Sequence, residues 1–177
     1  ATSKRINFSP DAPAKEASRS ALPALAQALQ DGGIHYRVGG AGKPEVLKSL
    51  VGLLRLPDMV NRDFLLQALL AREQLQSTGI GDGIGLPHVR NPAILEITTP
   101  MVCLCFLDAP VEFDALDGKP VKILFMPLSP DVRIHLHLLS RISFALRDAK
   151  FRALLAAEAR RDEILEAARA LEPASAD

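Results

Sequence analysis

Residues 72–91 read REQLQSTGIGDGIGLPHVRN, and no other part of the chain is so restricted in composition. Glycine occupies every second position over residues 79–85. Because glycine lacks a Cβ atom and readily adopts positive φ, this alternation disfavours a helix and predicts a turn followed by an extended run at 83–86. Pro87 restricts its own φ and favours extended geometry in the residue before it. The sequence therefore predicts that His88 stands at the end of a stiff strand, where its ring is available for chemistry.

A nucleotide-binding loop is the first alternative for a glycine-rich stretch. The P-loop requires a Gly-Lys-Ser/Thr sequence, and residues 72–91 contain no lysine. The dinucleotide fingerprint G-x-G-x-x-G fails because Ile84 or Leu86 stands where the third glycine is required. Both nucleotide motifs are thus excluded. His88 itself keeps two interpretations, a buried core histidine with a hydrogen-bond partner and a reactive ring held by the glycine and proline residues around it.

These residues carry a family resemblance. The segment STGIGDGIGLPH, preceded by Arg72 and Glu73, resembles the active-site signature of enzyme IIA domains of the bacterial phosphotransferase system, of the fructose/mannitol/nitrogen-regulatory type (EIIA type 2). The resemblance continues through DGKPV at 117–121 and HLHLLS at 135–140, and it covers residues 34–171. It implies a mixed sheet with helices on both faces, and phosphoryl transfer as the activity.

The resemblance, together with the chemistry of phosphoryl transfer, assigns roles to five residues. His88 accepts the phosphoryl group, on Nε2, from the phosphocarrier protein HPr or an HPr-like protein of the nitrogen branch. Arg72 supplies guanidinium donors to the phosphoryl oxygens, which suit the fixed fork of arginine, and Ser77 and Thr78 add hydroxyl or backbone donors. His135 matches the family's second active-site histidine, which hydrogen-bonds near the phosphorylated ring. Because donor and acceptor are both nitrogen and protein groups neutralise the charge, no cofactor and no metal are expected.

Three residues near His88 bear on the choice of partner. Asp82 stands where the family commonly has asparagine, and Val89 stands where glycine is common after the histidine. Neither departure touches the reactive atom, so we expect both to act on partner recognition. Arg90 is close enough in sequence to contact a partner, but a solvated surface arginine is an equally good interpretation.

A metal site at His135-x-His137 is the competing interpretation of those two histidines. Two ligands at this spacing share a face on a strand, whereas on a helix they are separated by about 200°. A stripe of apolar residues follows His135 at helical spacing, namely Leu139, Ile142 and Leu146. The pattern therefore predicts a helix with His135 at the edge of its apolar face and His137 pointing elsewhere, which disfavours a metal site.

Composition limits the function classes. The 177 residues include 48% hydrophobic residues and equal numbers of basic and acidic residues, 21 of each. Zero net charge offers no electrostatic basis for binding nucleic acid or an anionic membrane, and no apolar run is long enough to span a bilayer. No signal peptide is visible. We interpret Cys103 and Cys105 as small core residues of a protein in the reducing cytoplasm.

The pattern predicts one domain at 21–172, between a flexible segment or linker at 1–20 and a short tail at 173–177. Apolar periodicity predicts helices at 20–30, 43–55, 62–75, 133–147, 151–157 and 162–171, and strands at 34–38, 101–107 and 121–126. Asn61 is the expected N-cap of the third helix, Pro127 is expected to end the last strand, and residues 110–113 are expected to form a short hairpin arm. His35 falls on the polar phase of its strand, which predicts solvent exposure. Alternating strands and helices predict an α/β sandwich.

Two functions fit the resemblance, and a third interpretation remains. The first is a regulatory, nitrogen-type enzyme IIA, whose phosphorylation state controls binding to a target protein. The alternative is a sugar-transport enzyme IIA that passes phosphate to a IIB unit for fructose or mannitol uptake. The chain carries no transmembrane segment and no IIB cysteine motif, which favours regulation. A scaffold that is never phosphorylated is disfavoured because Arg72, His88 and His135 all stand at the expected positions.

Overall fold

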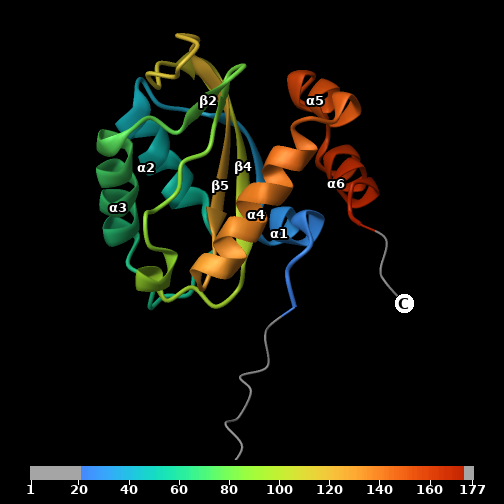
Figure 1. The fold of residues 1–177 in the computed structure, drawn as a ribbon. Coiled ribbons are helices and arrows are strands. Elements are labelled where there is room, and N and C mark those ends of the chain that lie inside the picture. The colour runs from blue at the N-terminus through green and yellow to red at the C-terminus, as the bar shows by residue number, and fades with distance from the viewer. Residues whose placement is uncertain (1–20, 174–177) are drawn as a thin grey trace, which may run out of the picture.

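The computed structural model describes residues 21–173, and a five-stranded sheet forms its centre (Figure 1). The strand order is β1-β4-β5-β3-β2. The strands are β1 (Ile34–Val38), β2 (Gly79–Gly81), β3 (Ile84–Gly85), β4 (Met101–Val111) and β5 (Val121–Leu128). β1 runs parallel to β4 and β3 runs parallel to β5, whereas β4–β5 and β2–β3 are antiparallel pairs. The sheet is therefore mixed, as expected.

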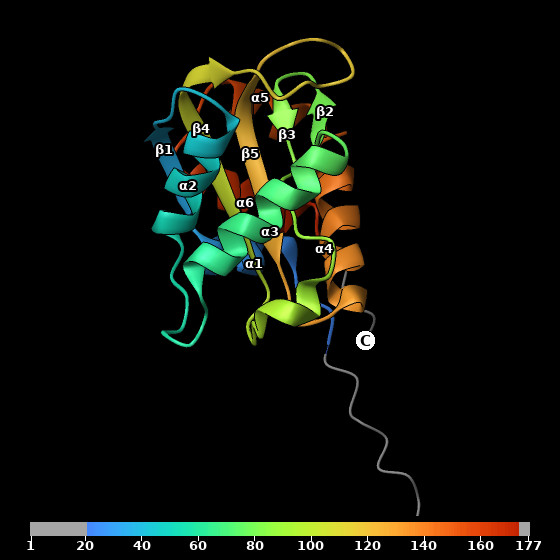
Figure 2. The same ribbon diagram turned by 90° about the vertical axis from the view of Figure 1, so that its left-hand side faces the viewer.

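Helices cover both faces of this sheet, so the predicted α/β/α sandwich is confirmed (Figures 1 and 2). Helices α2 and α3 lie on one face, and α1, α4, α5 and α6 lie on the other (Figure 1). The helices are α1 (Leu25–Gly32), α2 (Lys43–Leu53), α3 (Arg62–Leu75), α4 (Val132–Ala145), α5 (Ala149–Ala156) and α6 (Arg161–Ala170), with a short 3₁₀ helix η1 (Pro92–Leu95).

Two cores, one on each face of the sheet, follow from the alternation of side chains along β4. Val102, Leu104 and Phe106 pack with α1, α4, α5 and α6. Cys103 and Cys105 point to the other face and pack with α2 and α3. Both cysteines are buried and free, with their sulfur atoms 3.7 Å apart. Their interpretation as core residues is confirmed.

Local chemistry explains where several helices begin. The Asn61 side chain accepts a hydrogen bond from the Phe64 amide, which confirms the predicted N-cap of α3. Asp131 caps α4 in the same way, with 2.8 Å between its carboxylate and the Ile134 amide. This cap sets the register of α4 and hence the position of His135 in its first turn.

The glycine-rich stretch forms a tight hairpin. β2 and β3 are joined at Asp82 and Gly83, whose φ angles are 55° and 77°. Two successive positive φ values match a type I′ turn, for which Asp-Gly is a favoured pair. The prediction of a turn and an extended run is thus correct, but the strand before the turn, β2, was not anticipated.

Two details of β4 and β5 differ from expectation. Pro127 lies inside β5, where it faces Val102 of β4. A proline is tolerated there because β3 pairs with β5 at Ile123 and Leu124 and not at Pro127, which leaves one edge of β5 open. β4 continues to Val111, which pairs with Val121, so the expected arm at 110–113 is the end of a long hairpin.

His35 is partly buried and not simply exposed, because α2 packs against β1 on the face that carries its ring. No helix among residues 21–173 has the length and apolarity needed to cross a membrane. The segment predicted as a linker at 1–20 and residues 174–177 of the predicted tail lie outside the described residues, so both boundaries remain predictions.

Candidate active site

The backbone around His88 fixes the tautomer of its ring. His88 follows β3 and is half-buried, and its Nδ1 lies 2.7 Å from the Leu86 carbonyl oxygen. A carbonyl oxygen can only accept, so Nδ1 carries the proton of the neutral ring and Nε2 keeps its lone pair. The extended geometry of residues 86–88 makes this contact between side chain and backbone close. The free lone pair on Nε2 is what a nucleophilic histidine requires.

The surroundings of His88 keep its ring neutral. Burial is the largest cause that lowers its pKa below the ordinary value of 6.5, and the positive charge of Arg72 lowers it further. The Leu86 carbonyl and the Glu73 carboxylate act in the opposite direction without cancelling the effect. At neutral pH the ring is therefore uncharged, and its lone pair is available.

His135 lies beside His88 although the two residues come from different elements. The ring centroids are 5.4 Å apart and the ring planes meet at 45°. His135 is 6% exposed, and burial together with the neighbouring His88 lowers its pKa to about 4. Its Nδ1 is buried and has no hydrogen-bond partner among residues 21–173. A neutral second ring thus stands next to the candidate nucleophile.

Arg72 lies in the last turn of α3, where a positive charge is favourable. Its Nη1 donates to the Gln76 carbonyl oxygen at 2.7 Å. This contact uses one of its five N–H donors, and the charge of the guanidinium acts on the His88 ring. The rings of His88 and His135 therefore lie side by side, and Arg72 is near enough to act electrostatically on the His88 ring.

Ser77 and Thr78 lie in the loop between α3 and β2, and their hydroxyl groups already have partners. The Ser77 hydroxyl donates to the Phe113 carbonyl and accepts from the Gly79 amide at 3.0 Å. The Thr78 hydroxyl donates to the Glu73 carboxylate, and the Thr78 amide donates to the same carboxylate at 3.3 Å. In this structure both hydroxyls hold the loop. Their predicted role in phosphate binding is not tested by these contacts.

A buried ion pair that no pattern in the sequence indicates supports this loop. Glu73 is 8% exposed, and its Oε2 lies 3.0 Å from Nζ of Lys43. Lys43 Nζ also donates to the Phe113 carbonyl at 3.1 Å. Glu73 stands next to Arg72 in the signature, and Lys43 comes from α2. Proximity of these two residues depends on how α2 packs against α3, so no local pattern could reveal it.

A chain of hydrogen bonds connects the ion pair to the candidate nucleophile. The Glu73 carboxylate holds Thr78, and the Thr78 carbonyl accepts from the Leu86 amide at 2.9 Å. The Leu86 carbonyl then faces Nδ1 of His88 at 2.7 Å. The orientation of His88 therefore depends on Glu73 through backbone contacts.

Of the other residues considered from sequence, His137 lies away from this centre and Arg90 lies at its edge. Nε2 of His137 lies 2.8 Å from the Pro23 carbonyl oxygen, so α4 directs the two histidines of H-x-H differently, as expected for a helix. Among residues 21–173, no group of three or more His, Cys, Asp or Glu side chains is placed to hold a metal ion. Arg90 is exposed and lines a groove next to Arg72.

That groove is an open, mostly apolar hollow of about 600 Å³ beside the site. Its wall includes Arg72, Leu75, Arg90 and Ile94. Leu75 is 66% exposed and Ile94 is 48% exposed. Large apolar side chains that face solvent next to a reactive residue are typical of a surface for a protein partner.

Comparison with known proteins agrees with this geometry. The family model described as "Phosphoenolpyruvate-dependent sugar phosphotransferase system, EIIA 2" matches residues 13–169. A nitrogen regulatory protein of Pseudomonas aeruginosa is 39% identical over 132 residues, which are 72% of this chain and 83% of the relative. A fructose-specific EIIA component of Haloferax volcanii is 41% identical over 103 residues, which are 56% of this chain and 65% of the relative.

Solved structures give the same result. The nitrogen regulatory protein IIA-Ntr of Neisseria meningitidis superposes with a TM-score of 0.70 at 27% identity, covering 81% of this chain and 98% of that one. Mannitol enzyme IIA of Escherichia coli, solved in complex with phosphorylated enzyme IIB, shares the fold with a TM-score of 0.59 at 22% identity, covering 76% and 94%. The chain therefore belongs to the EIIA type 2 family of the phosphoenolpyruvate-dependent sugar phosphotransferase system and is a phosphocarrier of that family.

Proposed function

We propose that His88 is the phosphoryl acceptor and that it receives the group on Nε2 from HPr or an HPr-like phosphocarrier. The observation that carries this proposal is the 2.7 Å contact between Nδ1 and the Leu86 carbonyl, which leaves the Nε2 lone pair free. The lowered pKa of His88 supports it, because a neutral ring is the nucleophilic form.

In the transfer step, a bond forms between Nε2 of His88 and the phosphorus atom. The bond between phosphorus and the donor's histidine nitrogen breaks, and its electron pair stays on that nitrogen. Arg72 donates N–H groups to the phosphoryl oxygens, and the neutral ring of His135 donates its one N–H. Nδ1 of His88 keeps its proton and its contact with Leu86 throughout, so the ring does not need to reorient.

Ser77 and Thr78 remain candidates for phosphate binding. For either hydroxyl to donate to a phosphoryl oxygen, it must leave its present acceptor, Phe113 or Glu73. We propose that Thr78 keeps its contact with Glu73, because breaking that contact would leave a buried carboxylate with one partner fewer. Ser77 is less buried and has the greater freedom to turn towards the phosphoryl group.

We propose that the groove beside Arg72 is where the donor protein docks, in the cytoplasm. The exposed Leu75 and Ile94 offer apolar contact area, and Arg90 adds a positive charge at its rim. The complex of the mannitol relative with phosphorylated IIB is consistent with a protein partner at this kind of domain. A IIB unit or a regulated target protein would bind after the transfer.

A regulatory role of the nitrogen type is the function we favour. The Pseudomonas aeruginosa relative, a nitrogen regulatory protein, aligns over 72% of this chain, whereas the fructose-specific relative aligns over 56%. The comparable identity of the fructose-specific relative, 41%, keeps sugar transport as the second candidate. In that case phosphoryl-His88 would pass its group to a IIB unit.

The first experiment mixes the protein with HPr phosphorylated from phosphoenolpyruvate by enzyme I. We expect a mass gain of one phosphoryl group in an adduct that is labile to acid and stable to alkali. His88→Ala should form no adduct, and His137→Ala is the control that should form it normally. His135→Ala should slow the transfer and leave some adduct. An adduct that is stable to acid, or that forms in His88→Ala, would contradict the proposal.

The second experiment separates the two candidate functions. The phosphorylated protein is mixed with a purified IIB unit of the fructose type, and transfer is followed by the loss of the phosphoryl mass from one chain and its gain on the other. Fast and complete transfer would favour transport. Retention of the group on His88 over the same time would favour regulation.

A further inference from the structure

Phosphorylation adds more negative charge at His88 than the nearby cations balance. A phosphoryl group carries about 1.5 to 2 negative charges at pH 7. The charged side chains that act on the His88 ring are those of Arg72 and Glu73. Glu73 is paired with Lys43, whereas the guanidinium of Arg72 bonds to a carbonyl oxygen and not to a carboxylate. Arg72 therefore supplies one positive charge, and up to about one negative charge of the phosphoryl group stays unbalanced.

His135 is the neighbouring group that can gain a positive charge. Its ring centroid lies 5.4 Å from that of His88, and the residue is 6% exposed. Because Nε2 belongs to the His88 ring, a phosphorus atom bonded to it lies at most about 8 Å from the centre of the His135 ring in any direction, which does not exceed the Debye length at physiological ionic strength. Burial weakens the screening further, so the two charges attract each other.

Charged residues on the elements around His135 are engaged elsewhere or exposed. Helix α4 packs against β5, α1 and η1, of which η1 has no charged residue. The charged residues of α4, its cap, β5 and α1 are Asp131, Arg133, Arg141, Lys122 and Asp31. Lys122 pairs with Glu158, and Asp31 accepts from Gln27. Asp131 caps α4, and Arg141 donates to the Leu171 carbonyl. Arg133 and Arg90 are exposed, where solvent screens their charge.

The His135 ring is able to accept a proton without losing a contact. Its Nδ1 is buried and has no hydrogen-bond partner among residues 21–173, so protonation breaks no hydrogen bond there. Burial and the neighbouring His88 lower its pKa to about 4, which keeps the ring neutral before the transfer. A dianion beside the ring acts in the opposite direction, because an opposite charge favours the protonated form.

We propose that His135 takes up one proton when His88 is phosphorylated, so that two cations, the Arg72 guanidinium and the His135 imidazolium, balance the phosphoryl group. This inference rests on the proposed role of His88 as the acceptor. The phosphorus atom moves from the donor's nitrogen to Nε2 of His88, and the electron pair of the broken bond stays on the donor's nitrogen. A proton from solvent binds to the free ring nitrogen of His135. It returns to solvent when the phosphoryl group leaves His88, and a lower pH therefore favours the phosphorylated form.

NMR of the protein labelled with ¹⁵N-histidine tests the proposal between about pH 6 and about pH 9, with phosphoenolpyruvate, enzyme I and HPr keeping His88 phosphorylated. Without phosphorylation, His135 should stay neutral over this range because its pKa is about 4. With phosphorylation, its pKa should rise by about 3 units, to about 7. An adduct on His88 with unchanged His135 signals would overturn this inference alone. Absence of an adduct on His88 would overturn the proposed function as well.

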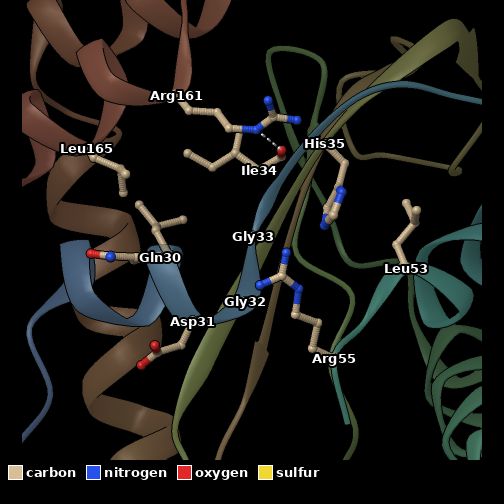
Figure 3. A pocket seen from close by; sticks show the side chains of 11 residues that line it. Gln30, Asp31, Gly32, Gly33, Ile34, His35, Leu53, Arg55, Arg161 and Leu165 are labelled. Carbon is tan, nitrogen blue, oxygen red and sulfur yellow. Dashed lines mark hydrogen bonds between the residues drawn. The ribbon is translucent and has the colours of Figure 1, made fainter.

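His35 is the internal control in the same spectra. Figure 3 shows its ring in the cavity at the β1 edge, near Gly33 and Leu53. Strands β4 and β5 stand between β1 and β3, the strand that leads to His88. Its titration should therefore be the same in both forms. An equal shift of His35 and His135 would mean that the whole protein changes on phosphorylation and would contradict a local proton uptake.

The transfer equilibrium between HPr and this protein gives a second measurement. When the pH falls from about 8 to about 6, the equilibrium constant for transfer to the unchanged protein should rise about tenfold more than that for His135→Gln. Glutamine retains an N–H donor and cannot take up a proton, and the contribution of HPr is the same in both reactions. Parallel changes in the two proteins would overturn the proposal. The NMR titration uses the unchanged protein, so it decides the question even if His135→Gln does not fold.

Discussion

The histidines at positions 88 and 35 are both partly buried, yet their surroundings give them opposite properties. Nδ1 of His88 faces a backbone carbonyl, and burial lowers the pKa of the ring. Nε2 of His35 is buried without a hydrogen-bond partner among residues 21–173, and the Cys103 sulfur raises the pKa of that ring. The comparison shows that two partly buried imidazoles differ in the direction of their pKa shift: burial outweighs the other causes at His88, whereas the contact with Cys103 outweighs burial at His35.

The regions around these two rings are also supported differently. His88 is held by a polar chain that runs from Lys43 and Glu73 through backbone groups. The region of His35 rests on close backbone packing, since a Cβ on Gly32 would lie 2.1 Å from the Val102 carbonyl oxygen. Loss of the Glu73 charge should therefore disturb the His88 region through its hydrogen bonds. Added volume at Gly32 should disturb the His35 region through a steric clash.

The largest effect is expected from Gly32→Ala, which breaks the support of the β1 region. The added methyl group cannot be accommodated without moving the backbone of α1 or β4, and we expect the free energy of unfolding to fall by about 4 kcal/mol or more. Urea unfolding measures it. Gly52→Ala is the control, because a Cβ at that helical position meets no atom within 4 Å. It should be neutral or stabilise by up to about 1 kcal/mol. Equal effects of the two changes would contradict this account.

Glu73→Gln should be next, and it breaks the support of the His88 region. The change leaves the buried ammonium of Lys43 without its counter-charge, which we expect to cost roughly 3 kcal/mol of unfolding free energy. Because the chain to Leu86 is disturbed, phosphoryl transfer to His88 should also slow while the adduct remains on the same residue. Transfer at the original rate in a variant shown to be folded would remove Glu73 from the positioning of His88.

The third prediction concerns the pH dependence of the free energy of unfolding, to which His135 contributes. Its pKa of about 4 lies below the ordinary 6.5, so the folded state binds fewer protons than the unfolded state between these values. Its contribution to stability is complete above pH 6.5 and is lost as the pH falls towards 4. When the pH is lowered from 7 to 5, the free energy of unfolding of the unchanged protein should fall by about 2 kcal/mol more than that of the His135→Gln variant. Urea unfolding at both pH values measures the difference, and parallel losses would contradict the pKa.

The smallest effect on stability should come from His35→Gln. Its pH dependence should be opposite to that of His135, because the pKa of His35 is raised and that of His135 is lowered. A raised pKa stabilises the folded state fully below pH 6.5, and this stabilisation is lost as the pH rises through the folded-state pKa. The variant should thus lose slightly more stability at pH 5 than at pH 7. Its rate of phosphoryl transfer should stay within about twofold of the original. A large loss of transfer would mean that the two regions are coupled.

Local signals in the sequence predicted much of the fold. The helix at Arg62–Leu75 was predicted to the residue, because Asn61 is a strong N-cap and the apolar spacing is regular. Strand β1 was predicted equally well from its alternation. The hairpin of β2 and β3 was half missed, although Asp82-Gly83 is the dipeptide that signals a type I′ turn. The prediction that Pro127 ends its strand was wrong, because a proline is tolerated inside β5 where no neighbouring strand needs its N–H, and the sequence does not show which edge of β5 is unpaired.

The amino-acid sequence by itself determined the periodic elements, the stiff run that ends at His88 and the family signature around it, because each depends on residues that are close along the chain. Tertiary structure alone decided the strand order, the 5.4 Å approach of His135 to His88 and the pairing of Lys43 with Glu73. These depend on how helices pack across a sheet. Packing brings together side chains that no local pattern connects, and the properties of both histidines follow from those neighbours.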